Sequence, residues 1–289
     1  MTSFVETKAP NSPASASANN SLITLLQTSI KNELAVLLTK TQAKAPSSFS
    51  SSHHPHQISL VVDDHQELNR LLIARKNNLL QATKMGLEMI SLRSNIDIMN
   101  MPTSEFATPL DGQTLRWSGY DKEGSPIFIC RAKTYAPWTF KKHEYRNYTF
   151  FILSLIVASM TAKSDKFVVI FNLAGFRARM GGLAATQCSK AMIDVVQKCF
   201  PERCKTAFLV EHPKVFSFLW KMVAPMINER TRSKVAFLDG DAAEWQAELK
   251  KVIDPAMLEL DMGGTKAECY PIHEFPLPLE IERIKNSLF

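Results

Sequence analysis

The sequence has no long apolar segment and few cysteines. Residues 1–20 contain no apolar run, which argues against a secretory signal peptide. The apolar stretch 147–162 is shorter than the roughly 20 residues that a membrane-spanning helix needs. The cysteines are odd in number and form no C-x-x-C pair, which favours reduced, buried thiols over disulfides or a zinc site: Cys130, Cys188, Cys199, Cys204 and Cys269. These absences predict a soluble protein of the cytoplasm.

The common catalytic motifs are also absent. The sequence contains no G-x-S-x-G, no P-loop, no G-x-G-x-x-G and no H-E-x-x-H. A Gly-Gly-Thr-Lys run at 263–266 lacks the upstream glycine of a phosphate loop. Asp239, Asp241 and Glu244 follow a predicted strand, where their place at a helix N-terminus explains them without a metal. We therefore predict that the protein is not an enzyme and holds no metal or cofactor.

The composition and charge exclude little. Apolar residues make up 45% of the 289 residues and charged residues 21%, which is ordinary for a globular protein. Lysine and arginine number 34 against 28 acidic residues, a net charge of +6, and such an excess suits an anionic membrane surface or a nucleic acid. The basic residues are scattered without aromatic residues between them, so we predict no nucleic-acid binding.

The N-terminal extension, residues 1–60, is predicted to be disordered apart from one helix. Residues 1–20 are rich in Ser, Ala, Asn and Pro and bury too little apolar surface to offset the cost of ordering. Leucines and isoleucines at helical spacing predict an amphipathic helix over 21–40, which could dock on the body, dimerise or lie on a membrane. Docking is the simplest interpretation. Residues 41–59 have the composition of a linker.

A helical lobe is predicted over residues 61–100. Asp64, with Glu67 three residues later, is close to a capping box. Leucines then continue at helical spacing as two helices with a break near residues 77–78. Three basic residues lie between the leucines, and spacing alone favours a solvated face for them: Arg70, Arg75 and Lys76.

Strands and helices alternate between residues 115 and 265. Apolar, β-branched and aromatic runs predict strands at 126–131, 166–173, 205–210 and 233–238. Helical patterns fall at 144–162, 183–199, 212–231 and 242–252. This alternation predicts an α/β fold with a mainly parallel sheet and right-handed crossovers. Residues 266–289 are predicted to be a C-terminal tail that ends in a short helix.

The helix predicted between the last two strands is unusually apolar. Its apolar residues cover more than one stripe, whereas an ordinary surface helix has one apolar face and a charged back: Val215, Phe216, Phe218, Leu219, Met222, Val223, Met226 and Ile227. Such a helix can bury one side on the sheet and offer the other to something apolar.

Three segments together resemble the CRAL-TRIO lipid-binding family, and within it the yeast phosphatidylinositol/phosphatidylcholine transfer branch. LNRLLIARKNNLLQATKM (68–85) is similar to the family's L-L-R-F-L-R-A-R-K helix. The segment FPERCKTAFLVEHPKVFSFLWKMVAPMINERTRSKVAFL (200–238) is similar to its Y-P-E-R, N-x-P and S-K-I segments, and LELDMGG (258–264) stands at its L-P-x-x-x-G-G. The resemblance covers roughly residues 64–265.

The resemblance implies a CRAL-TRIO-like α/β fold. A small helical N-terminal lobe precedes a lipid-binding domain, residues 115–265, in which a mainly parallel sheet and helices surround an apolar cavity. The apolar helix 212–228 corresponds to the family's mobile gate over the cavity mouth. The resemblance assigns five residues to this gate: Val215, Phe216, Leu219, Val223 and Met226.

The resemblance also implies a lipid headgroup site. The family's phosphatidylinositol-binding positions are occupied here by Arg75, Lys76, Glu202 and Lys234, and Thr231 also matches. The residue types fit this chemistry, because cationic side chains form charge-assisted hydrogen bonds with a phosphodiester, and a carboxylate accepts hydrogen bonds from inositol hydroxyls.

By this resemblance the protein is expected to transfer or present lipids. It would bind phosphatidylinositol and a second membrane lipid, and it would contact membranes transiently as a monomer. Lipid kinases are candidate partners. The bound phospholipid counts as a ligand and not as a cofactor. Two alternatives stay open. One is a carrier of another hydrophobic molecule (a retinoid, tocopherol or sterol), and the other is a regulatory module that senses lipid.

Overall fold

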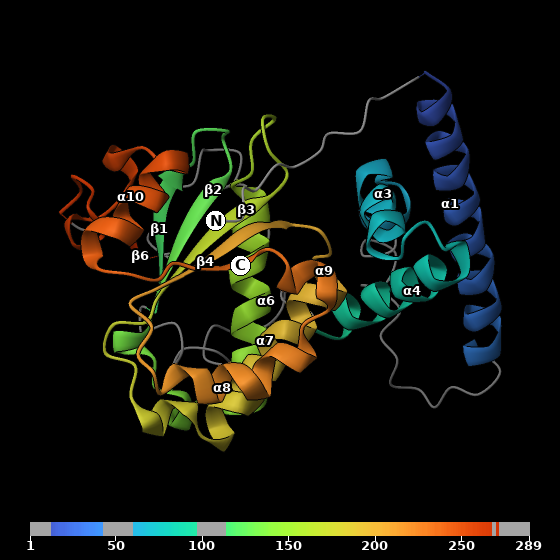
Figure 1. The fold of residues 1–289 in the computed structure, drawn as a ribbon. Coiled ribbons are helices and arrows are strands. Elements are labelled where there is room, and N and C mark those ends of the chain that lie inside the picture. The colour runs from blue at the N-terminus through green and yellow to red at the C-terminus, as the bar shows by residue number, and fades with distance from the viewer. Residues whose placement is uncertain (1–12, 43–59, 97–113, 268–269, 272–289) are drawn as a thin grey trace. The chain divides into compact units, whose positions relative to one another are not determined.

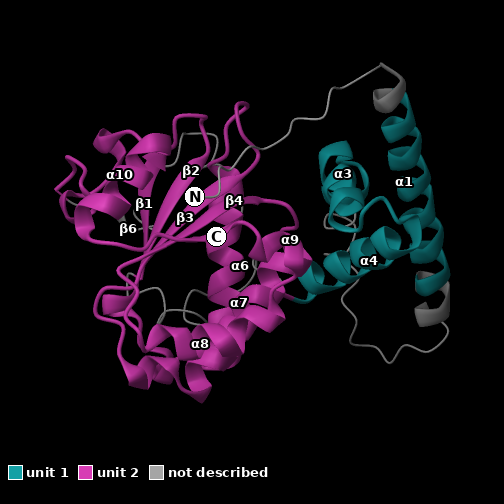
Figure 2. Cartoon of the chain, in the orientation of Figure 1, with its two compact units in different colours: residues 1–95 teal, residues 96–289 magenta. Residues whose placement is uncertain are grey.

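The computed structural model describes residues 13–42, 60–96, 114–267 and 270–271 (Figure 1). The chain divides into two compact units, residues 1–95 and residues 96–289 (Figure 2), and each is described by itself. None of the described helices is long and apolar enough to cross a membrane.

The first unit consists of α1 (Pro13–Gln42), α3 (His65–Ala74) and α4 (Leu79–Ile96). One stripe of α1 packs on the other two helices, and Ile23, Leu26 and Ile30 are buried against residues such as Leu68 and Leu71. The helix predicted over 21–40 therefore docks within this unit, which was the simplest of the three interpretations.

Part of the predicted disorder in residues 1–20 is wrong, because α1 begins at Pro13. Alanine, the best helix former, alternates with Ser and Asn in this stretch. The Ser21 hydroxyl donates to the carbonyl of Ser17 (3.1 Å), and Asn19 donates a side-chain hydrogen bond to Asn69 of α3 (3.2 Å). Composition alone did not reveal this anchoring. Residues 1–12, and the predicted linker beyond the end of α1, lie outside the described residues.

An ion-pair network is buried where α3 begins. Asp64 caps the helix by accepting hydrogen bonds from the backbone N–H groups of Gln66 (2.7 Å) and Glu67 (3.1 Å). The Glu67 carboxylate binds Arg70 (2.7 Å) and Arg93 (2.9 Å). The expectation that Arg70 belongs to a solvated face is therefore wrong, because Arg70 is buried and its charge is neutralised inside the unit.

The second unit contains a six-stranded sheet with strand order β5-β4-β3-β2-β1-β6. Strands β2, β3, β4 and β5 are parallel to one another, and β1 is antiparallel to both β2 and β6. The strand bounds are β1 Leu115–Tyr120, β2 Pro126–Arg131, β3 Phe167–Asn172, β4 Cys204–Val210, β5 Val235–Phe237 and β6 Tyr270–Pro271. The predicted mainly parallel α/β sheet is confirmed.

The antiparallel edge was not predicted from the sequence. Strand β1 is joined to β2 by a turn in which the Asp121 carboxylate accepts hydrogen bonds from the N–H groups of Glu123 (3.0 Å) and Ser125 (2.7 Å). Strand β6 pairs with the outer side of β1, so the predicted tail begins with residues that belong to the sheet. Its predicted C-terminal helix lies outside the described residues.

Alternate residues of the strands serve two different layers. On one face, Ile129 of β2 and Ile170 of β3 pack with Trp245 and Leu249 of α10 (Ala242–Val252). On the opposite face lie α6 (Lys142–Ala158), α7 (Leu183–Cys199) and α8 (Phe216–Val223) (Figure 1).

The single helix predicted over 212–231 is wrong. The structure has α8 (Phe216–Val223), a 3-10 turn at Ala224–Met226 and a separate α9 (Glu229–Arg232). Pro225 causes the break, because proline has no N–H to continue the helical ladder and its ring crowds the preceding turn. The Asn228 side chain then caps α9 by accepting from the N–H of Thr231 (2.8 Å).

Candidate functional site

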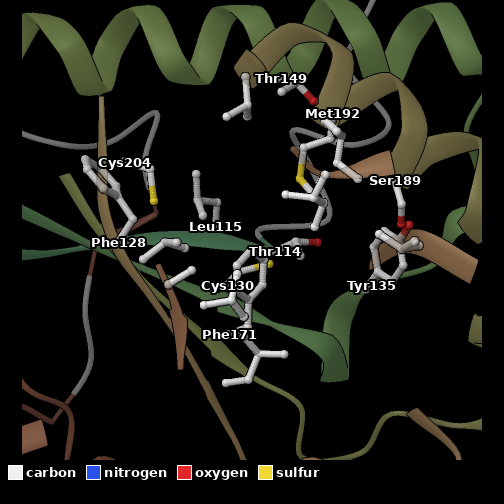
Figure 3. Close-up of a pocket in the computed structure, with 18 of the residues that line it drawn as sticks. Thr114, Leu115, Phe128, Cys130, Tyr135, Thr149, Phe171, Ser189, Met192 and Cys204 are labelled. Atoms are coloured by element: carbon white, nitrogen blue, oxygen red, sulfur yellow. The ribbon is translucent and has the colours of Figure 1, made fainter. Parts of the chain in front are cut away.

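A cavity of about 270 Å³ lies between the sheet and α6, α7 and α8. Figure 3 shows Phe128, Cys130 and Phe171 reaching it from the strands, with Thr149 of α6 and Met192 of α7 on the helical side. These strand residues point away from the face that α10 covers, so the same strands supply a solid core on one side and a cavity lining on the other.

Among the described residues, the cavity lining carries no charged side chain. Its titratable groups are tyrosines and thiols, and burial raises the pKa of each: to about 12 for Cys130, to about 11 for Cys204, and well above the usual range for Tyr145. All of them are therefore protonated and neutral at physiological pH. An apolar cavity without charge suits hydrocarbon and disfavours a free ionic ligand.

The proposed gate residues occupy different places on α8 and beside it. Phe216, Leu219 and Val223 line the cavity, whereas Val215 precedes the helix and is 38% exposed. Met226 lies in the 3-10 turn and packs against the buried cluster that contains Phe216, Leu219 and Val223, but it does not line the cavity. Two further lining residues of this segment, Trp220 and Ile227, were not among the predicted gate residues.

A glutamine on α7 ties the segment after α8 to the helix beneath it. The amide nitrogen of Gln197 donates to the carbonyl of Met226 (3.0 Å). Its amide oxygen accepts from the backbone N–H (2.7 Å) and the side chain (2.5 Å) of Asn228. Gln197 also lines the cavity. No sequence motif marked this residue, because its partners are some thirty positions away along the chain.

Glu202 and Lys234, two of the predicted headgroup residues, lie together at the amino ends of β4 and β5. The Lys234 Nζ is 3.0 Å from Glu202 Oε2, and Arg230 Nε is 2.7 Å from Glu202 Oε1. Burial acts to raise the pKa of Glu202, but the hydrogen bond from Arg230 and the charge of Lys234 outweigh it and lower this pKa. Arg230 was missed by the sequence analysis, although it stands next to Thr231 in the matched segment.

Thr231 connects this charged cluster to the cavity. It belongs to α9, follows Arg230 directly and lines the cavity. The lining that the structure describes is therefore uncharged, and beside it lies an ion-paired group of two cations and one carboxylate.

The other two predicted headgroup residues belong to the first unit. Arg75 caps the C-terminus of α3 and donates to the carbonyl of Ala74 (3.1 Å). Lys76 is exposed and follows in a left-handed turn with φ 51°. That Arg75 and Lys76 bind the same lipid headgroup as Glu202 and Lys234 stays a prediction.

The residues set aside as possible metal or acid–base groups have structural roles. Asp241 caps α10 by accepting from the N–H of Glu244 (3.0 Å), and Glu244 accepts from the N–H of Asp241 (2.9 Å). Asp239 lies 3.1 Å from the His212 ring nitrogen. Among the described residues, no group of three or more His, Cys, Asp and Glu side chains is arranged to hold a metal ion.

Residues 110–264 match the family described as CRAL/TRIO domain. A CRAL-TRIO domain-containing protein of Caenorhabditis elegans is 26% identical over 160 residues, which cover 52% of this chain and 22% of that protein. The phosphatidylinositol/phosphatidylcholine transfer protein SFH4 of Arabidopsis thaliana is 25% identical over 231 residues, 73% of this chain and 37% of that protein. The chain thus spans well under half the length of these curated relatives.

Among solved structures, the crystal structure of Sfh5 superposes with a TM-score of 0.63 at 11% identity and covers 93% of this chain and 97% of that one. This likeness concerns the fold alone. Because the CRAL/TRIO match spans more than half of the sequence, the chain belongs to the CRAL/TRIO domain family.

Proposed function

We propose that this protein is a lipid carrier that binds phosphatidylinositol, and a second membrane lipid, and exchanges them with membranes. The observation that carries the proposal is the pairing of an uncharged cavity with a cationic cluster beside one end of it. Acyl chains would occupy the cavity, the phosphodiester would approach Lys234 and Thr231, and the inositol hydroxyls would donate to Glu202. The Arabidopsis relative that is called a phosphatidylinositol/phosphatidylcholine transfer protein supports the same class of ligand.

The headgroup contacts are expected to set lipid selectivity. Each buried methylene is worth about 0.8 kcal/mol relative to water, but the lipid leaves a membrane and not water, so this term nearly cancels in exchange. Lys234 is held by Glu202 at 3.0 Å, and charge-assisted hydrogen bonds to a phosphodiester are stronger than neutral ones. In this proposal Arg75 and Lys76 add two further cations.

Lipid entry would require movement of α8. The cavity of about 270 Å³ lies just below the usual ligand-site volumes of about 300–1,000 Å³, so a lipid with two acyl chains would need it to widen. The outer side of α8 carries Phe218, which is 64% exposed, and Lys214 and Lys221 are exposed near it. Contact of this side with an anionic bilayer would support opening as a gating step.

Lipid transfer between vesicles tests the headgroup assignment. The Lys76→Ala, Lys234→Ala double variant should transfer phosphatidylinositol at least about tenfold more slowly, since each charge-assisted hydrogen bond contributes about 1.5–3 kcal/mol. The matched control is Lys163→Ala with Lys190→Ala, which removes two exposed cations that make no ion pair among the described residues. Wild-type transfer by the first variant would overturn the headgroup site.

Mass spectrometry of lipid extracted from the purified protein identifies the ligand. Phosphatidylinositol together with a second phospholipid supports the proposal. A sterol, retinoid or tocopherol would instead assign a different cargo to the same cavity. Protein that carries no lipid and transfers none would favour a module that senses lipid and recruits a partner such as a lipid kinase.

A further inference from the structure

A second cleft, of about 470 Å³, opens at the carboxyl ends of β2 and β3. It is lined by the last residues of these strands, Arg131 and Asn172, and by loop residues that follow them, among them Lys133, Arg177 and Arg179. The crevice outside the carboxyl ends of parallel strands is the usual ligand position in open α/β sheets. No part of the proposed lipid headgroup site contributes to it.

The cleft has an excess of positive charge. Arg131 is already neutralised, because its guanidinium binds Asp261 (2.8 and 3.0 Å) and Glu259. Lys133, Arg177 and Arg179 are exposed, and none of the three forms an ion pair with a carboxylate of the described residues. Three uncompensated cations thus converge on one concave surface.

Parts of this cluster are held in place without a ligand. The Arg179 guanidinium lies 4.6 Å from the centre of the Trp138 ring, a cation–π contact that fixes a long side chain. Asn172 is only 4% exposed. Its side-chain oxygen accepts from the N–H of Ala174 (3.0 Å), and its amide N–H groups have no acceptor among the described residues. Asn172 lines the cleft, so its amide group is available to donate to a ligand bound there.

The chemistry of the cluster indicates an oxyanion with several charges. Arginine guanidinium groups match phosphate oxygens in a two-pronged geometry, and lysine adds a point charge. A neutral amide donor at the floor can bind a further oxygen. We propose that this cleft binds a phosphate-bearing anion, either the phosphorylated headgroup of a membrane lipid or a soluble phosphate ester.

This site is distinct from the one near Lys234. Glu202 and Lys234 precede β4 and β5, whereas Arg131 and Asn172 end β2 and β3, and these four strands are parallel. The two sites therefore lie at opposite ends of the strands, one at the amino ends and the other at the carboxyl ends. They are separated by the length of a strand, about 17–20 Å at roughly 3.3 Å per residue, so no single headgroup can occupy both.

Two probes with the same headgroup test the proposal. The soluble probe is inositol 1,4,5-trisphosphate, measured by calorimetry. The membrane probe is a phosphatidylcholine vesicle that contains phosphatidylinositol 4,5-bisphosphate, measured by co-sedimentation. The Lys133→Ala, Arg177→Ala double variant should weaken binding at least about tenfold, since it removes two charge-assisted contacts. Both side chains are exposed, so the fold should persist, and circular dichroism checks this.

The same control pair, Lys163→Ala with Lys190→Ala, changes the net charge equally and should leave binding within about twofold of wild type, because exposed distant charges are largely screened. Binding of both probes, or of either alone, with loss in the cleft variant supports the site and assigns its source as lipid, soluble ester or both. Lys234→Ala should leave this binding intact, which separates it from the proposed lipid carriage. Equal binding by the cleft variant and wild type, or no binding of either probe, would overturn the proposal.

Discussion

Gln197 offers a direct way to loosen the segment that follows α8. Replacement by methionine keeps the side-chain volume but removes the bonds to the Met226 carbonyl (3.0 Å) and to Asn228 (2.7 and 2.5 Å). A hydrogen bond contributes about 1 kcal/mol net. Since Asn228 is exposed and water can replace part of the loss, we expect a cost of about 1–2 kcal/mol in total.

If α8 moves as a gate, the loss of these hydrogen bonds destabilises the closed state relative to the open state. A change of 1–2 kcal/mol alters an equilibrium roughly 5–30-fold, so Gln197→Met should raise the rate of fluorescent-lipid exchange by about that factor. Amide hydrogen exchange in residues 224–231 should rise in parallel.

Gln187→Met on the exposed side of the same helix is the matched control, and it should exchange lipid at the wild-type rate. Unchanged exchange in Gln197→Met, or an equal increase in the control, would refute the gating argument.

Three further predictions concern buried and charged groups. Glu67→Ala should destabilise the first unit by about 3–5 kcal/mol, because it leaves two arginines without their buried partner; hydrogen exchange in α1, α3 and α4 measures this, and protection equal to wild type would contradict it. The fold lowers the pKa of Glu202. The ionised side chain therefore stabilises the protein fully at pH values above its unfolded pKa of about 4.3, and this contribution is lost as the pH falls through the lower pKa of the folded state. Glu202→Gln should remove this acid-dependent part from a series of urea titrations, whereas an unchanged pH profile would reject the assignment. Cys130, with its pKa raised to about 12, should react with iodoacetamide at pH 8 far more slowly than a free cysteine. Under the proposed gating, vesicles should raise this rate.

Segments with a strong local pattern were predicted well from the sequence. The helix predicted over 183–199 and the strand predicted over 126–131 have the bounds seen in the structure, because the first has a helical period and the second is an apolar run that begins after a turn. The matched glycines at 263–264 also have a local cause. Gly263 takes a left-handed conformation with φ 77° after a 3-10 turn, and a β-carbon on Gly264 would collide with the backbone of Leu258.

Features that depend on distant contacts were not predictable in this way. Strand β1 has no long apolar run and exists through its pairing with β2 and β6. The helix over 212–231 was overextended because its apolar residues continue across Pro225 while its backbone does not. The partnership of Arg230 with Glu202 joins positions 28 residues apart, and periodicity cannot distinguish a residue that lines a cavity from one that fills a core.

The division of labour between the two faces of β2, β3 and β4 bears on how the protein can change over time. Ile129 belongs to the solid layer under α10, while its neighbour Cys130 faces the cavity. A substitution at the first position changes the stability of the fold, whereas one at the second changes the shape of the cavity. Neighbouring residues of one strand are thus under separate selective pressures, and under the proposed function a change of hydrophobic ligand would leave the core beneath α10 intact.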